Sequence, residues 1–152
     1  TAKGEKRLMN YESLSDGGFA TGSMMGSGGF IVLDEDQCIV KNTYTLARFY
    51  RHESCGQCSP CREGTGWMEK ILKSIDEGKG AMSDIDLLWD IQRKIEGNTI
   101  CPLGDAAAWP VAAAIRHFRD EFEWHVLNPE KCLTQNYGLA HYADPIHVPV
   151  TV

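Results

Sequence analysis

The chain has 152 residues, of which 43% are hydrophobic and 24% charged, and this composition is ordinary for a globular protein with a packed core. A formal net charge of −6, without a basic cluster, argues against a nucleic-acid-binding protein. No hydrophobic run approaches the roughly 18 residues of a membrane span, so direct membrane insertion is not expected. The first ten residues are polar and basic, and we expect no signal peptide there.

The N-terminal part of the chain contains one candidate strand. A glycine-rich stretch at 22–29 leads into an apolar, β-branched run at 30–33, which predicts a buried strand. One strand cannot form a sheet, so we interpret this part as the edge of a larger β element. The glycine-rich stretch lacks the Lys-Ser/Thr pair of a phosphate-binding loop, and it opens a strand rather than a helix. It therefore indicates a turn and not a nucleotide site.

Two helices are predicted on either side of a cysteine cluster. Hydrophobic residues spaced for one face of a helix predict the first over residues 43–51. The second is expected to begin with Ser59 as its N-cap and Pro60 in its first helical position, and to end near Gly78. The residues predicted on the inner faces of these helices are Leu46, Phe49, Tyr50, Trp67, Ile71, Leu72 and Ile75.

Two more helices are predicted further along the chain. Ser83 and the acidic residues after it indicate the start of the third, and Gly97 has the position of a C-terminal capping glycine. Pro110 is not expected inside a regular helix, so the fourth is predicted to begin there, after a short turn, and to end at Asn128. The residues predicted on the inner faces are Ile85, Leu88, Trp89, Ile95, Val111, Ile115, Phe118, Phe122 and Val126.

These elements predict a mainly α protein in three parts. Residues 1–38 are interpreted as the C-terminal remnant of a β domain. Residues 39–127 are expected to form a helical domain of four helices. Residues 128–152 show no periodicity, and we expect an extended C-terminal tail.

The strongest chemical pattern is a group of three closely spaced cysteines. Cys55, Cys58 and Cys61 follow a C-x2-C-x2-C pattern, which places three thiols on one turn. A fourth, Cys101, lies forty residues after the third and is followed by Pro102. Three close cysteines and one remote Cys-Pro are typical of proteins that bind a [4Fe–4S] cluster. We therefore predict that these four thiolates bind one such cluster and that the chain transfers single electrons.

Other interpretations of these cysteines stay open. A structural zinc-binding interaction module needs the same four thiols, although structural zinc generally uses two separated pairs of ligands. A bacterial ferredoxin would have its fourth cysteine at position 65, where this chain has Thr65, so the site needs Cys101. Disulfides are not expected, because such crowded cysteines do not readily pair with each other and the clustering is typical of metal ligands in a reducing compartment.

The remaining candidate residues are expected to have structural roles. His52, just before the cysteine turn, could tune a cluster or act as a ligand, but a solvent-exposed histidine at a helix end is the simpler interpretation. Cys38 and Cys132 are interpreted as ordinary small residues, and His117 and His125 as surface residues of the long helix. The residues predicted to be core or interface anchors rather than cofactor contacts are Trp67, Trp89, Trp109 and Trp124.

Two segments carry a resemblance to a known family. They are ESCGQCSPCREG at 53–64 and IEGNTICPLGDAAAWP at 95–110. Both closely resemble the C-terminal part of the F-type subunit of NADH-quinone oxidoreductase, which is the flavin-bearing, NADH-oxidising subunit of respiratory complex I. Segments 11–14 and 26–33 are also similar, and the resemblance covers roughly residues 11–127.

The resemblance implies a site, a fold and a chemistry. It implies that the cube lies in a four-helix iron–sulfur bundle, after a ubiquitin-like (β-grasp) domain of which residues 22–34 would be the last strand region. In such subunits NADH reduces FMN by hydride transfer, and the flavin passes single electrons to the [4Fe–4S] cluster. The family's cluster ligands fall on Cys55, Cys58, Cys61 and Cys101.

The resemblance also implies partners and a location. The cluster would pass electrons to iron–sulfur clusters in neighbouring E-type and G-type subunits, in a complex on the cytoplasmic side, peripheral to the inner face of the membrane. The FMN- and NADH-binding domain of the family is missing from this chain, so we expect it to bind neither ligand by itself. Diaphorase subunits of NAD-reducing hydrogenases and of NAD-linked formate dehydrogenases share the motif and are the alternative.

Overall fold

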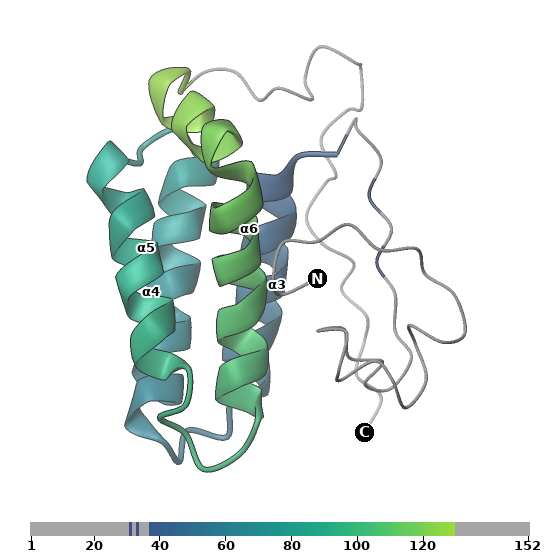
Figure 1. Ribbon diagram of the computed structural model, residues 1–152, viewed down its shortest axis with the longest axis vertical. Helices are drawn as coiled ribbons and strands as arrows, with labels where there is room; N and C mark the ends of the chain where they lie inside the picture. The colour runs from purple at the N-terminus through teal and green to yellow at the C-terminus, as the bar shows by residue number, and fades with distance from the viewer. Residues whose placement is uncertain (1–30, 32, 34–36, 130–152) are drawn as a thin grey trace. The chain divides into compact units, whose positions relative to one another are not determined.

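The computed structural model describes residues 31, 33 and 37–129, and this part of the chain is helical. Four helices run alternately in opposite directions, and short loops join them (Figure 1). The arrangement is an up-and-down four-helix bundle, and it confirms the four helices that the sequence predicts. In chain order these helices are α3 (Ile39–Glu53), α4 (Ser59–Asp76), α5 (Met82–Ile95) and α6 (Leu103–Leu127).

The predicted strand region at 22–34 and the tail at 128–152 lie almost wholly outside the described residues, and Cys132 lies there too. The β-grasp interpretation therefore stays a prediction. Among the residues that are described, no helix combines the length and the apolar character needed to cross a membrane.

The local sequence explains where the helices begin and end. Cys58 is the N-cap of α4, one residue before the predicted Ser59, so Pro60 lies in the first turn, where its missing N–H costs no hydrogen bond. Asp84 accepts a hydrogen bond at 2.8 Å from the backbone N–H three residues before it, which closes the start of α5. Gly97 follows α5 with a φ of 72°, the left-handed conformation expected of a capping glycine.

The inner face of α4 differs from the prediction. Trp67 was predicted on the inner face, as a core or interface anchor, but it is 53% exposed and so is not a core residue. Gly64 is buried instead, and a Cβ there would lie 2.6 Å from Cδ1 of Ile95, so α4 and α5 approach each other closely at this glycine. Glycine adds nothing to a hydrophobic pattern, so the prediction centred the face on the large residues nearby. The buried residues of α4 are Cys61, Gly64, Thr65, Met68, Glu69, Leu72 and Ile75.

A similar shift affects α3. This helix begins at Ile39, four residues before the predicted start. Phe49, predicted on the inner face, is 54% exposed, and its ring lies edge-on to Tyr50 at the helix surface. The small residues of the helix make the close contacts instead. The buried residues of α3 are Val40, Thr43 and Ala47.

Helix α6 contains Pro110, which was predicted to start it, and that prediction is wrong. The helix begins seven residues earlier, at Leu103, and continues through the proline without the hydrogen bond that an N–H there would make. Ala107 and Ala108 are buried beside it, and this packing offsets the missing bond. The irregular backbone is at Phe118, with φ −136° and ψ 30°, and the end of α6 bends (Figure 1). The break leaves Phe118 44% exposed rather than buried as predicted.

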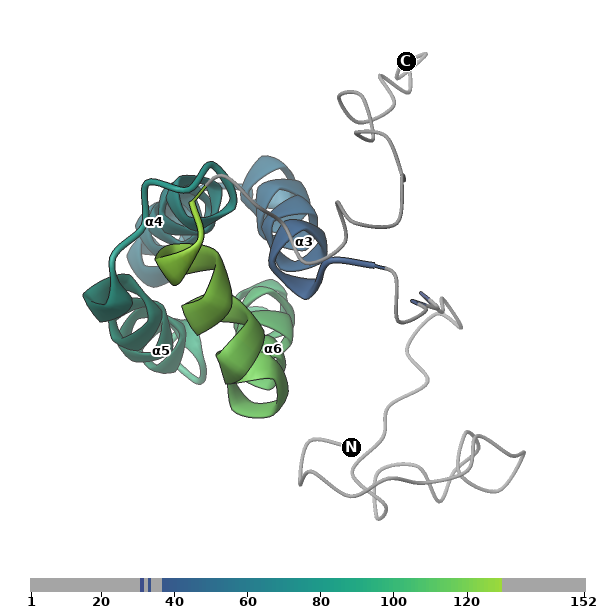
Figure 2. The ribbon, with the colours of Figure 1, turned by 90° about the horizontal axis from the view of Figure 1, so that it is seen from above.

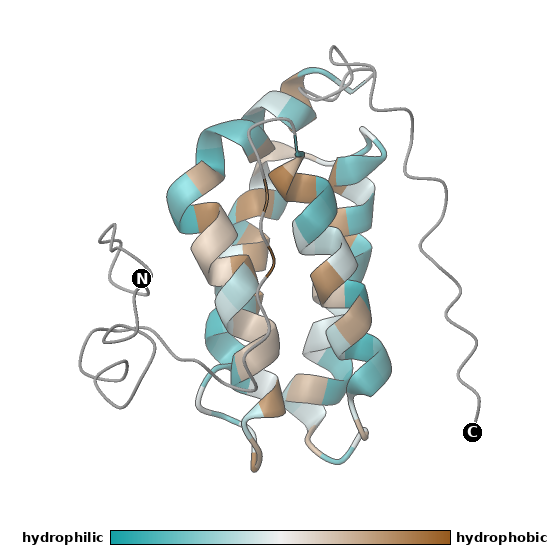
Figure 3. Cartoon of the chain, turned by 90° about the vertical axis from the view of Figure 1, so that its right-hand side faces the viewer, coloured by the Kyte–Doolittle hydropathy of each residue, from teal (hydrophilic) through white to brown (hydrophobic). Residues whose placement is uncertain are grey.

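One hydrophobic core holds these helices together. Figure 2 shows the four helices around a common centre, and Figure 3 shows hydrophobic and hydrophilic residues alternating along each of them. Most of the predicted inner positions on α4, α5 and α6 are confirmed. The predicted core residues that are at most 4% exposed are Leu72, Ile75, Ile85, Leu88, Ile95, Val111, Ile115 and Phe122.

Candidate metal centre

The two loops that carry the predicted ligands lie at the same end of the bundle (Figure 1). Cys55 and Cys58 lie between α3 and α4, and Cys101 lies between α5 and α6. The backbone N–H of Ile100 donates a hydrogen bond to Sγ of Cys58 at 3.4 Å. The loop of the remote cysteine is therefore in direct contact with the turn of the three clustered ones.

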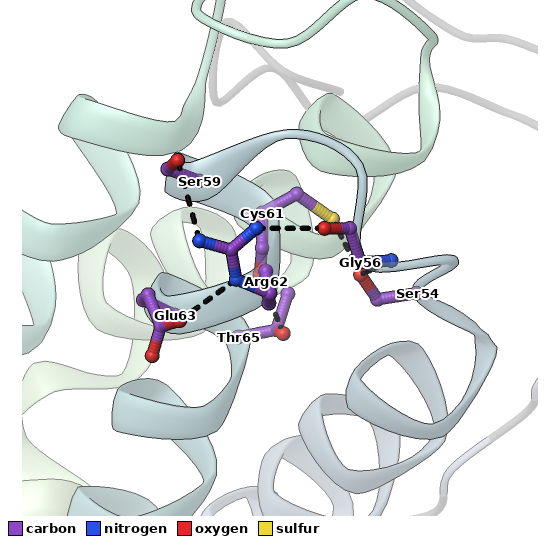
Figure 4. A network of polar contacts seen from close by, with 7 residues as sticks. All are labelled: Ser54, Gly56, Ser59, Cys61, Arg62, Glu63 and Thr65. Carbon is purple, nitrogen blue, oxygen red and sulfur yellow. Dashed lines mark hydrogen bonds and ion pairs between the residues drawn. The ribbon is translucent and has the colours of Figure 1, made fainter.

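Short-range contacts fix the turn of the clustered cysteines. Gly56 has a φ of 80°, a conformation that favours glycine. Arg62 donates from Nη1 to the carbonyl oxygen of Gly56 at 2.9 Å and so closes the turn onto α4 (Figure 4). Cys61, in the first turn of α4, is 7% exposed, and its Sγ lies 3.2 Å from the hydroxyl of Ser54. Cys55 is left exposed at the surface.

The loop of Cys101 is fixed in a similar way. Thr99 donates from its hydroxyl to the carbonyl oxygen of Cys101 at 2.9 Å. The first turn of α6 packs against this threonine, because a Cβ at Gly104 would lie 2.4 Å from the Thr99 hydroxyl oxygen. Asp105 accepts a hydrogen bond from the N–H of Gly97 at 2.7 Å, which ties the end of α5 to the start of α6. The side chain of Ile100 at the tip is 87% exposed.

These contacts suit the chemistry of a thiolate-bound metal. Thiolate ligands carry negative charge, and hydrogen-bond donors aimed at their sulfurs stabilise that charge and tune a bound iron–sulfur cluster. The Ile100 N–H donates to one of the four sulfurs, and the Ser54 hydroxyl lies within hydrogen-bonding distance of a second. No disulfide consumes any of the thiols in the described part of the chain. The cysteines there that form no disulfide are Cys38, Cys55, Cys58, Cys61 and Cys101.

His52 is an exposed residue at the end of α3, as predicted. Its side chain is 79% exposed, and its Nδ1 lies 2.8 Å from a carboxylate oxygen of Glu53. Nearby, Arg51 forms an ion pair with Glu69 of α4, which joins the two helices below the cysteine turn.

The four tryptophans differ in their burial. Trp89 packs partly buried against the core, whereas Trp67 is exposed. Trp109 is 44% exposed, and its indole N–H donates to Oε1 of Glu96 at 2.8 Å, so it anchors the loop of the remote cysteine to α6. Trp124 lies edge-on to the imidazole ring of the next residue. Trp109 therefore acts as an anchor for the site rather than as part of the core.

A second group of polar residues, which sequence reasoning missed, is buried where α3 meets α6. Cys38 is the N-cap of α3, and its Sγ lies 3.2 Å from Nε2 of His125. His125 is 3% exposed, so its interpretation as a surface residue is wrong, and burial lowers its pKa. Glu121 lies beside them; burial raises its pKa, and a hydrogen bond from the N–H of Ile39 opposes that rise. His117 is exposed, as predicted.

The sequence held little that could have found this group. Cys38 and His125 are 87 residues apart, so no local motif connects them. The only local sign is the spacing of Glu121 and His125, which are one helical turn apart on the same face.

Comparison with known proteins agrees with the geometry of the two loops. Residues 41–125 match the family described as the NADH-ubiquinone oxidoreductase-F iron-sulfur binding region. An F-type subunit of the NADH-quinone oxidoreductase of Rhizobium meliloti (strain 1021) is 47% identical over 116 residues, which are 76% of this chain and 26% of that protein. The corresponding F-type subunit of Rickettsia bellii (strain OSU 85-389) is 50% identical over 115 residues, or 76% of this chain and 27% of that protein.

A solved structure is also similar. It is the crystal structure of an NAD+-reducing [NiFe]-hydrogenase in the H2-reduced state, with a TM-score of 0.60 and 34% sequence identity, covering 62% of this chain and 16% of that one. The chain spans about a quarter of the length of the curated relatives named above. Within that span, the chain belongs to the family of NADH-ubiquinone oxidoreductase-F iron-sulfur binding regions.

Proposed function

We propose that this chain is an electron-transfer module that holds one [4Fe–4S] cluster on Cys55, Cys58, Cys61 and Cys101. When bound, the cluster supplies one-electron redox chemistry. The donor set fits such a group, because it consists of four thiols that form no disulfide, three on two loops that touch each other and one in the adjoining first turn of α4. The single observation that carries the proposal is the hydrogen bond from Ile100 to Cys58, since it draws the remote loop to the clustered turn.

The chain's own residues would position and tune the ligands. The Ile100 N–H and the Ser54 hydroxyl lie within hydrogen-bonding distance of two of the sulfurs, and both would favour the reduced, more negative form of a bound cluster. Cys55 and Cys101 are exposed, so a redox partner can approach the site from the loop end of the bundle. Cys61 is buried beneath them and joins the site to the core.

We propose further that the module works in an NADH-quinone oxidoreductase, as the names of its relatives suggest. It would receive electrons from NADH-reduced FMN, held by the remainder of a full-length subunit. It would pass them to iron–sulfur clusters in the E-type and G-type subunits, in a complex on the cytoplasmic side of the membrane. The exposed Ile100 beside the ligands is a candidate contact for such a partner.

A second candidate function is the diaphorase part of an NAD-reducing hydrogenase. The similarity to the solved hydrogenase structure favours it, and both candidates use the same cluster. Affinity purification of the complex from its native cells separates them. Recovery with quinone-reductase subunits would support the first candidate, and recovery with a nickel–iron subunit would support the second.

The cluster itself can be tested on the purified chain. Prepared anaerobically, the chain should contain about four irons and four labile sulfides, and its dithionite-reduced form should give a low-temperature electron paramagnetic resonance signal of a [4Fe–4S]+ centre. Cys101→Ser should lose the cluster, whereas Cys132→Ser, which changes a cysteine with no predicted ligand role, should keep it. One zinc per chain without labile sulfide would instead establish a structural zinc module, and full iron loading of Cys101→Ser would show that the fourth ligand is wrong.

A further inference from the structure

A compact group of metal-binding side chains lies away from the cysteine loops. Cys38, Glu121 and His125 each offer one ligand atom, and all three atoms lie within 4.8 Å of one another. Cys38 begins α3, whereas the cysteine turn follows the end of that helix, so about 22 Å of helix separates the two groups. Cys38 and His125 are 5% and 3% exposed, and Glu121 is partly buried. The group is therefore distinct from the proposed cluster site.

We propose that Cys38, Glu121 and His125 form a second metal site, which binds one divalent zinc-like cation. A thiolate, an imidazole and a carboxylate are the three ligand types that proteins use for Zn²⁺. Mg²⁺ and Ca²⁺ prefer sites built wholly from oxygen atoms, so the sulfur and nitrogen donors select against them. Three protein ligands leave a fourth tetrahedral position for water.

The distances fit a single ion. Zinc–ligand bonds of about 2.0–2.3 Å in a tetrahedron place neighbouring ligand atoms about 3.3–3.8 Å apart. Sγ of Cys38 and Nε2 of His125 are already 3.2 Å apart, so these two atoms need to move only slightly to reach the spacing of zinc ligands. The Glu121 oxygen in the group lies within 4.8 Å of both of these atoms, so a small shift of the Glu121 side chain would bring all three to the spacing that one ion needs.

The surroundings hold the ligands in place. Oε1 of Glu121 accepts a hydrogen bond from the N–H of Ile39 at 2.8 Å, which fixes the orientation of the carboxylate. The N–H of Lys41 donates to Sγ of Cys38 at 3.4 Å. Such contacts to ligand side chains are a regular feature of protein metal sites.

The local charge also favours a dication. With the thiol of Cys38 deprotonated, Cys38, Glu121 and the nearby Asp76 of α4 carry three negative charges, and Lys41 supplies one positive charge close to Asp76. A Zn²⁺ ion would neutralise the two negative charges that remain, and its binding would release the proton of the Cys38 thiol. The ion would also join the start of α3 to the part of α6 that follows the break at Phe118.

The test uses the full chain with its iron–sulfur cluster loaded, so that the cysteine loops are filled. After treatment with a chelator, one equivalent of Zn²⁺ is added, unbound metal is removed, and zinc and iron are counted by elemental analysis. Zinc X-ray absorption then reports the ligands. We expect one zinc per chain, with one sulfur and two or three nitrogen or oxygen neighbours, and no displacement by millimolar Mg²⁺. A zinc with four sulfur neighbours would place the ion at the cysteine loops and overturn the second site.

Matched variants test the assignment of ligands. Cys38→Ser, Glu121→Gln and His125→Gln should each weaken zinc binding at least tenfold, whereas His117→Gln, on an exposed position of the same helix, should leave it unchanged. Circular dichroism checks that the variants are folded. Glu121→Gln should disturb the fold least, because Glu121 is only partly buried. Failure of the wild-type chain to retain zinc, or equal retention by the folded variants, would show that the three side chains only satisfy one another's hydrogen bonds. Iron content is measured separately, so loss of the proposed cluster would not be mistaken for either result.

Discussion

The glycine at position 104 provides a test of how tightly the cysteine loops must pack. In Gly104→Ala the new Cβ would lie 2.4 Å from the hydroxyl oxygen of Thr99 and 2.6 Å from its methyl carbon. Thr99 must then shift, and its hydroxyl holds the carbonyl oxygen of Cys101. Overpacking of this kind typically costs about 1–3 kcal/mol, against which alanine gains up to about 1 kcal/mol in helix propensity. The expected net loss of stability is about 0–3 kcal/mol.

Gly66→Ala is the matched control. Gly66 also lies within a helix, but a Cβ there would have its nearest contact at 3.6 Å, with Nε of Arg51, which is ordinary packing. This variant should therefore gain up to about 1 kcal/mol, so the two variants should differ by about 1–3 kcal/mol. For the helical domain at 39–127, a stability difference of this size corresponds to at least about 4 °C in melting temperature.

The assay is thermal unfolding of both variants, followed by the rate at which a chelator removes iron from the anaerobically loaded chain. Gly104→Ala should melt lower and release iron faster than Gly66→Ala. The double variant Gly104→Ala/Thr99→Ala should lose less stability than the sum of the two single changes, because the two nearest clashing atoms, the hydroxyl oxygen and the methyl carbon of Thr99, are gone. Equal stability and equal iron release for the two glycine variants would refute the claim that the loop must pack against the first turn of α6.

Two further predictions concern the core and its charges. Phe122→Ala should destabilise the chain by about 3–5 kcal/mol in denaturant unfolding, whereas Phe118→Ala should cost less than about 1 kcal/mol. The reason is that the ring of Phe122 is fully buried and that of Phe118 is exposed. Similar losses for the two variants would mean that the break in α6 is misplaced. Burial raises the pKa of Asp76, and the residue also lies at the C-terminal end of α4, where a negative charge is unfavourable. The ionised carboxylate therefore opposes folding. Asp76→Asn should stabilise the chain at pH 7 by about 0.5–1 kcal/mol. The carboxyl proton of Asp76 stays bound to a higher pH in the folded state than in the unfolded state. The stability gained by Asp76→Asn should therefore shrink as the pH falls toward 3.8, the usual pKa of an aspartate. A gain that does not change with pH would contradict the claim that the buried charge opposes folding. The charged groups that act on Asp76 are Lys41, His125 and Glu77.

The helices and the cysteine loops could be predicted from local patterns. The two caps at Asp84 and Gly97 depend on residues within one turn of the helix ends, and such short-range effects are visible in a sequence. The cysteine spacing is also local, and it indicates which turn carries three thiols. Their position at one end of the bundle follows from the alternating directions of helices that short connections join, because the first and third connections of such a bundle lie at the same end.

Other features depend on packing that no local pattern encodes. Gly64 sets the inner face of α4 because it lets α5 approach, yet a glycine gives no hydrophobic pattern. Pro110 stays helical because tertiary packing outweighs its local preference for a helix start. His125 is buried because it meets Cys38, a partner far away in the chain. Each of these errors has the same physical origin, which is a contact made between helices rather than within one.

The hydrogen bond between the two cysteine loops determines how freely residue 100, at the tip of the second loop, can vary in sequence. Ile100 contributes its main-chain N–H to Cys58, while its side chain points into solvent. Nineteen of the twenty amino acids keep that N–H, and proline alone lacks it. In the proposed electron-transfer module, substitutions at this position would change the surface offered to a neighbouring protein while Cys58 keeps its hydrogen-bond donor, so partner recognition and tuning of the cluster would be separable within one residue.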